Sequence, residues 1–145
     1  SDLNYLGSTS MALHVDIISP ERPLYSGEAI SVTAPAHDGE IGILERHSPM
    51  VSKLGVGEVR IKRGSLGGQV DDRFAVRNGF VQTAENKVII IAEEAVRADD
   101  IDHASLDHEL SELEKQMAGD LERVERAEAS ARVAWLKTQK GITQS

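Results

Sequence analysis

The chain has 145 residues, 40% of them hydrophobic and 28% charged, so it can form one domain or a compact domain with a smaller appendage, but not a large multidomain enzyme. Its net charge of -8 disfavours binding to nucleic acids and to anionic lipid surfaces, because both repel an acidic chain. Its aromatic content of 3% also disfavours nucleic-acid binding by base stacking, which requires aromatic side chains. Cysteine is absent, which excludes disulfides, thiolate nucleophiles and zinc–thiolate sites.

No stretch approaches the roughly 20 apolar residues that a membrane span requires, and the longest apolar run, 88–92, has the length of a strand. We therefore expect no direct lipid insertion. Residues 1–10 have neither a basic end nor an apolar stretch, and they precede Met11. We interpret them as a cloning remnant and leave them out of the fold prediction.

Residues 11–97 have the pattern of a β-sandwich domain. Apolar residues alternate, as in Leu13, Val15 and Ile17, and turn residues recur about every ten positions. Asn78-Gly79 is the sharpest local signal for a tight turn, because both residues tolerate positive φ. The pattern predicts an antiparallel sandwich of about ten strands.

Residues 98–145 change to a helical period, so the whole chain is predicted to be α+β. One stripe starts at Leu106 and ends at Met117, and Gly119-Asp120 then breaks the helix and supplies a new cap. A second, alanine-rich stripe consists of Leu121, Val124, Ala127, Ala131, Ala134 and Trp135. These stripes predict an antiparallel helical hairpin that buries little area and is only marginally attached.

Catalytic and metal chemistry are not indicated. His47 and Ser48 are adjacent, so on extended chain their side chains point to opposite faces, and no nucleophile elbow surrounds the serine. On a helix His103 and His108 would lie about 140° apart, too far to chelate one ion. We therefore predict no catalytic residue and no metal site, and a structural or interaction protein rather than an enzyme.

A motif in the first region resembles a known family. Residues 39–49 read Gly39-Glu40-Ile41-Gly42-Ile43-Leu44-Glu45-Arg46-His47-Ser48-Pro49. This segment is similar to the G-E-(I/L)-G-(I/L)-x-x-x-H-x-P signature of the epsilon subunit of bacterial and chloroplast F-type ATP synthases, the counterpart of mitochondrial delta. Segments 13–20, 78–81 and 88–93 agree with the family in order, and the resemblance covers essentially residues 11–140.

The resemblance implies a non-catalytic rotor subunit of the central stalk, which binds the gamma subunit and rests on the c-ring. It implies a peripheral position at the cytoplasmic face of the bacterial inner membrane. His47 and Pro49 are then candidates for the gamma interface. The residues expected to contact the c-ring are Asp38, Gly39, Glu40, Ile41 and Gly42.

In the bacterial family the hairpin is a regulatory arm that blocks ATP hydrolysis when it extends into the catalytic alpha/beta head. Arg123, Arg126 and Arg132 would give the second helix a basic side for that contact, or they are ordinary solvated charges. Some relatives bind ATP through I-D-x-x-R-A on the first helix, where this chain has Ser105 and Leu106 at the last two positions. The arginine is lost, so no cofactor is expected.

Two other functions stay open at this point. The hairpin could be a nucleotide-binding sensor, or the chain could be a generic β-sandwich binding module with a helical dimerisation tail.

Residues 98–145 hold 11 acidic and 6 basic side chains, so the predicted arm carries -5 of the net charge of -8.

Overall fold

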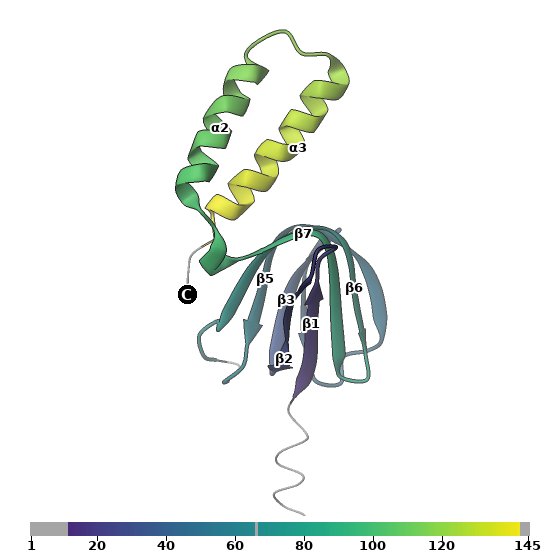
Figure 1. Cartoon of the computed structure of the whole chain (residues 1–145). Coiled ribbons are helices and arrows are strands. Elements are labelled where there is room, and N and C mark those ends of the chain that lie inside the picture. Colours follow the sequence, from purple (N-terminus) through teal and green to yellow (C-terminus); the bar gives the residue numbers. More distant parts are fainter. Residues whose placement is uncertain (1–11, 66, 143–145) are drawn as a thin grey trace, which may run out of the picture.

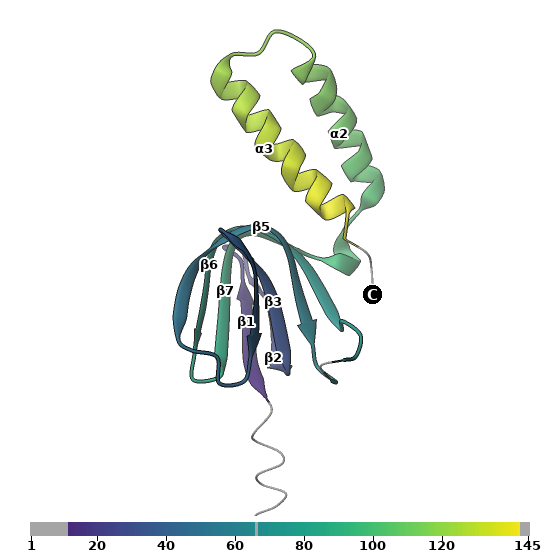
Figure 2. The same cartoon turned by 180° about the vertical axis from the view of Figure 1, so that it is seen from behind.

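The computed structural model describes residues 12–65 and 67–142. Residues 1–10, interpreted above as a cloning remnant, lie outside the described residues. It consists of a β-sandwich with a helical hairpin standing at one end (Figures 1 and 2). The strands are β1 (Leu13–Ile18), β2 (Pro23–Ala29), β3 (Ser31–Ala36), β4 (Gly39–Leu44), β5 (Met50–Lys62), β6 (Asp72–Ala84) and β7 (Lys87–Arg97). The helices are the short 3-10 turn η1 (Ala98–Asp100), α2 (His103–Met117) and α3 (Arg123–Lys140).

The sandwich is one curved, mixed sheet in the order β2-β1-β7-β6-β5-β3-β4. Every pairing is antiparallel except that of β1 with β7, which is parallel. The described residues form seven strands rather than about ten, because β5 and β6 each run for 13 residues and β7 for 11. Alternate side chains from all seven strands fill a core that includes Leu13, Ile43 and Phe74.

The turn predicted at Asn78-Gly79 is wrong. Both residues have positive φ, 57° and 123°, but they lie inside β6, which continues through them and stays paired with both neighbours. The tight turn lies instead at Glu85-Asn86, where φ is 51° and 62° and where β6 passes into β7. A positive φ can therefore produce a kink within a long strand as well as a reversal of the chain.

We expect Gly79→Ala to destabilise the protein by about 3 kcal/mol, because a Cβ there would overlap the carbonyl oxygen of Ile91 on β7 and the backbone is left-handed. Gly42→Ala is the matched control, since no atom lies within 4 Å of its added Cβ. It should change the free energy of unfolding by less than about 0.5 kcal/mol. Urea unfolding of both variants measures the difference, and equal stability of the two would contradict this account of the kink.

The hairpin forms as predicted, but its second helix starts later and buries another face. Glu122 precedes α3, and its backbone N–H donates to the side chain of Glu125 at 3.3 Å, so Asp120 is not the cap. Of the expected stripe only Trp135 is buried, whereas Val124, Ala127, Ala131 and Ala134 are exposed. The buried residues of α3 are Ala129, Trp135, Leu136 and Gln139. Packing of α3 against α2 and the end of the sandwich, rather than helical spacing alone, decides which face is buried.

At the start of α2, Asp102 is the N-cap. Its carboxylate accepts hydrogen bonds from the hydroxyl and the backbone N–H of Ser105, at 2.8 Å and 3.2 Å. These bonds, that of the hydroxyl above all, lower the pKa of Asp102. Ser105 thus contributes to the cap that fixes the beginning of the hairpin.

A second, smaller apolar cluster joins the hairpin to the sandwich. Trp135 and Leu136 of α3 pack there with Leu106 and Leu110 of α2. The strands contribute only Ala75 of β6 and the partly buried Val96 of β7. The hairpin therefore has a core of its own, and its apolar contact with the strands is small.

Candidate functional site

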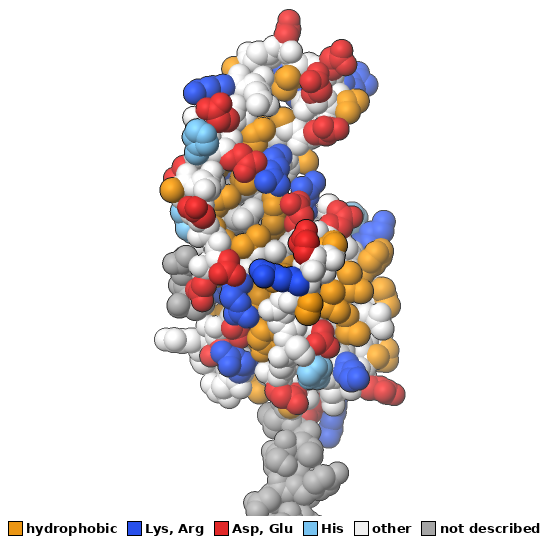
Figure 3. Space-filling model, viewed as in Figure 1, with side chains coloured by type: hydrophobic (Ala, Val, Ile, Leu, Met, Phe, Trp, Pro, Cys, Tyr) orange, Lys and Arg blue, Asp and Glu red, His pale blue; other side chains and the backbone are white. Residues whose placement is uncertain are grey.

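A hydrophobic surface lies on the outer face of the sandwich, on the side where β6 and β7 run (Figure 3). Phe80 of β6 is paired with Ile91 of β7, and Ile91 is paired with Ile18 of β1, so the three side chains form a row across the sheet. Their exposed fractions are 51%, 50% and 38%. We call these three residues and Val51 of β5 the apolar patch.

A shallow depression of about 390 Å³ adjoins the patch. Val51, which is 67% exposed, lines it and is paired with Gln82 of β6, two residues from Phe80. The complete lining is Pro49, Met50, Val51, Gln82, Thr83 and Ala84. A contiguous apolar surface with a depression beside it is typical of a protein–protein interface.

The gamma-interface candidates His47 and Pro49 lie at one end of this surface. Pro49 is exposed and lines the depression, so the structure brings it together with the apolar patch. His47 is half-buried, and its Nδ1 donates to the carbonyl oxygen of Ser48 at 2.8 Å. The backbone N–H of Arg46 donates to Oδ1 of Asn86 at 2.7 Å, which ties this connection to the turn between β6 and β7.

The apolar patch is not among the sequence predictions, because residues 88–92 are interpreted there only as an apolar run of strand length and no face is assigned to its side chains. Strand alternation contained the signal: Val88, Ile90 and Ala92 are buried, so Ile91 points outward. Its cross-strand neighbour Phe80 is outward for the same reason.

The residues expected to contact the c-ring belong mainly to the edge strand of the sheet. The turn consists of His37 and Asp38, and Gly39 to Gly42 already belong to β4, the edge strand. Ile41 is half-buried against the main core. Asp38 and Glu40 remain exposed, so two carboxylates flank Gly39 at this end of β4.

Glu40 is held in place by an arginine of β5. Its carboxylate pairs with Arg60 at 2.9 Å, and the Glu40 side chain is 54% exposed. The hydrogen bond that Arg60 donates to Glu40, followed by the one that it donates to Glu58, raises the pKa of Arg60. Arg60 therefore orients the acidic group without removing it from solvent.

The three candidate arginines of the hairpin do not form one basic side. At about 100° per residue, Arg123 and Arg132 lie on opposite sides of α3. Arg126 donates to the carbonyl oxygens of Met117 and Gly119, at 3.0 Å and 3.2 Å, and so satisfies the C-terminal end of α2. Arg123 is exposed and has no hydrogen bond or ion pair among the described residues.

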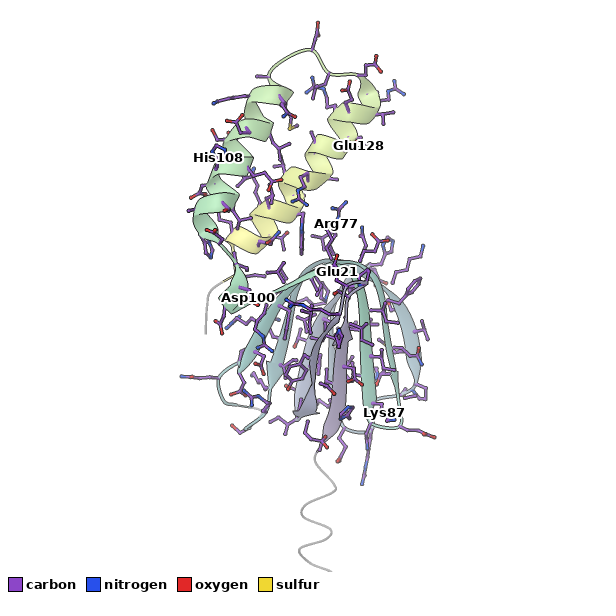
Figure 4. All side chains as sticks on the ribbon, in the orientation of Figure 1. Glu21, Arg77, Lys87, Asp100, His108 and Glu128 are labelled. Atoms are coloured by element: carbon purple, nitrogen blue, oxygen red, sulfur yellow. The ribbon has the colours of Figure 1, made fainter. Side chains whose placement is uncertain are left out.

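Arg132 joins both helices and the sandwich in one chain of ion pairs. It pairs with Glu109 of α2 at 2.9 Å and with Glu94 of β7 at 3.4 Å. Glu94 also pairs with Arg77 of β6 at 2.7 Å. Figure 4 shows Arg77 at the end of the sandwich that faces the hairpin. The hydrogen bond to Glu109, with a smaller contribution from Glu94, raises the pKa of Arg132.

The sandwich corresponds to a known domain. The beta-sandwich domain of the ATP synthase delta/epsilon chain matches residues 12–98. The chain belongs to the ATP synthase delta/epsilon family. "ATP synthase epsilon chain 1" of Methylococcus capsulatus is 41% identical over 125 residues, which cover 86% of this chain and 87% of the relative. The epsilon chain of Halorhodospira halophila is 35% identical over 122 residues, covering 84% and 85%.

Solved structures show the same fold for this delta/epsilon family member. A chain in the mitochondrial ATP synthase of Euglena gracilis, solved as OSCP/F1/c-ring, has a TM-score of 0.74 and 21% identity, covering 88% of this chain and 79% of that chain. A chain in the central stalk/c-ring of the Tetrahymena thermophila enzyme has a TM-score of 0.59 and 18% identity, covering 88% and 96%.

Across residues 12–65 and 67–142, no helix has the length and apolar character needed to cross a membrane. Within the same residues, histidine, aspartate and glutamate side chains form no group of three or more suited to a metal ion. His108 is exposed on α2 (Figure 4). His103, the first residue of α2, is half-buried.

Proposed function

We propose that this protein is a non-catalytic subunit of the central stalk of an F-type ATP synthase, which couples proton-driven rotation of the c-ring to ATP synthesis through gamma. The apolar patch and its adjoining depression carry this proposal. They offer a rigid, exposed surface on the sandwich that a rotor partner can cover. The subunit then sits peripherally at the cytoplasmic face of the bacterial inner membrane.

Gamma is the partner that we assign to the apolar patch. Pro49 lines the depression beside Val51, so a partner seated on Phe80 and Ile91 also reaches the connection that contains His47. Aromatic and aliphatic anchors in the centre of such a surface usually supply most of the binding energy. Co-purification of the chain with gamma tests the assignment: a stoichiometric complex supports it, and a generic sandwich module would form none.

The c-ring is the partner that we assign to the β3–β4 turn. Asp38 and Glu40 are exposed there, and Glu40 is oriented by Arg60. Polar side chains held on the rigid turn between two paired strands suit a contact with the polar loops of a membrane ring.

We expect Glu40→Lys to weaken assembly with the c-ring by about tenfold while leaving the fold intact. The substitution replaces an exposed carboxylate by an amine beside Arg60, so both the charge offered to the ring and the pair that orients it are lost. ATP-driven proton pumping by the assembled complex measures the effect. Glu28→Lys, the same charge reversal at another exposed glutamate, on β2, is the control. Unchanged pumping by Glu40→Lys would contradict the assignment of the turn.

The hairpin is proposed to act as a conformational inhibitor of ATP hydrolysis. Its apolar contact with the strands is limited to Ala75 and Val96, which suits an element with two positions separated by a few kcal/mol. When extended, it would reach the alpha/beta head with its arginines. Nothing in the described residues favours a nucleotide-sensing hairpin over this role, since Ser105 is engaged with Asp102.

A further inference from the structure

Glu94 occupies a position that no other described carboxylate shares, between the sandwich and the hairpin. One oxygen pairs with Arg77 of β6 at 2.7 Å, and the other pairs with Arg132 of α3 at 3.4 Å. Arg132 is in turn fixed by Glu109 of α2, through Nε at 2.9 Å and Nη2 at 3.5 Å. Four side chains from four elements are thus linked in series.

These ion pairs are partly open to solvent. The exposed fractions of Arg77, Glu94, Arg132 and Glu109 are 26%, 41%, 39% and 42%. Ions therefore screen the chain of pairs, and each pair alone is weak. The apolar contact beneath them is also small, because the strands contribute only alanine and valine side chains to it. A few weak pairs can then decide where the hairpin lies.

We propose that Glu94 is the electrostatic latch of the hairpin: by binding Arg77 and Arg132 together it holds the hairpin against the sandwich, and an anionic protein surface that competes for Arg132 opens it. This proposal rests on the proposed mobility of the hairpin, and it adds the contact that controls whether the hairpin is docked or released. Arg132 is the shared element, because its guanidinium cannot bind Glu94 and Glu109 and at the same time face an acidic partner. The docked and extended positions therefore exclude each other through one side chain.

Trp135 reports the latch in the isolated full-length protein. It is the only tryptophan of the chain, it is 2% exposed, and it lies in the cluster that contains Ala75. We expect Glu94→Gln to increase the released population about threefold at low salt, which is the order expected from losing the one partly exposed pair that joins the sandwich to the hairpin, that of Glu94 with Arg132. Quenching of Trp135 fluorescence by acrylamide measures the release, and 1 M NaCl should produce a similar increase in the unmodified protein.

Glu93→Gln is the matched control. It removes the same charge from the neighbouring residue, whose carboxylate is exposed and contacts only Asn78, at 3.5 Å, among the described side chains. Its quenching should equal that of the unmodified protein. Unchanged quenching in Glu94→Gln, or an equal increase in both variants, would overturn the latch.

A second variant separates the latch from inhibition. Arg132→Gln should give the same increase in quenching as Glu94→Gln, and the double variant should add little to either, because both changes break the same link. Independent, additive increases would overturn the proposal. If quenching responds as expected while ATP hydrolysis by the assembled head does not, the latch stands and the inhibitory role fails. If removal of the hairpin relieves inhibition while quenching in the full-length Glu94→Gln variant is unchanged, the inhibitory role stands and the latch fails.

Discussion

Removal of residues 99–145 is expected to leave a folded sandwich that still binds gamma and to raise ATP hydrolysis by the assembled head several-fold. The main core consists of residues from β1 to β7 and includes no residue of either helix. Among the described residues, Ala75 and Val96 are the strand residues in the apolar cluster that the hairpin shares with the sandwich, so loss of the hairpin uncovers little apolar area. If the hairpin is the inhibitor, the shortened chain cannot block the head.

Two measurements test this prediction. Thermal unfolding of the shortened chain shows whether the sandwich keeps a cooperative transition, and hydrolysis by the reconstituted head shows whether inhibition is gone. A chain that ends after Ile142 keeps the whole hairpin cluster and is the control. Loss of gamma binding in the shortened chain would refute the division into sandwich and hairpin. Unchanged hydrolysis would refute the inhibitory role alone.

Much of the fold was predictable because it depends on local periodicity. Leu13, Val15 and Ile17 alternate in the sequence, and all three are fully buried in β1. Leu106 and Leu110 are spaced as in a helix and face the partner helix. Alternation and helical spacing therefore sufficed for the sandwich and the hairpin.

The face of α3 and the position of the kink depend on tertiary structure instead. Ala127 and Ala131 fit a helical stripe as well as Ala129 and Leu136 do, and only the packing partner decides which stripe is buried. Asn78-Gly79 has the composition of a turn, but its pairing with β5 and β7 continues on both sides. Local composition does not contain these pairings.

The candidate site also contains residues that the local sequence identifies and residues that only tertiary contacts identify. Glu40 and Pro49 were found through the signature, whereas Phe80 lies in a predicted strand and no sequence prediction marks its side chain as exposed. The link between Glu94 and Arg132 joins residues 38 positions apart, and no sequence pattern predicts it. Contacts between distant elements were thus the part of the site that required the structure.

The largest effect on assembly is expected from charges placed on the apolar patch. Phe80→Glu together with Ile91→Glu should weaken binding to gamma by about 100-fold or more, since each change puts an unpaired carboxylate into the centre of an interface that must exclude water. The two side chains are about half exposed in the free protein. The variant should therefore remain folded, with its midpoint of unfolding close to that of the unmodified chain.

Val124→Glu is the matched control, because Val124 is a 67% exposed hydrophobic residue that lies on α3 rather than on the sandwich. It should leave gamma binding unchanged in a titration followed by calorimetry. The heat capacity change provides a second criterion: if gamma covers the patch, binding by the unmodified chain shows a negative heat capacity change, which is the sign of apolar burial. Tight binding by the doubly charged variant, with the heat capacity change intact, would place gamma elsewhere on the sandwich and would leave the patch without its assigned partner.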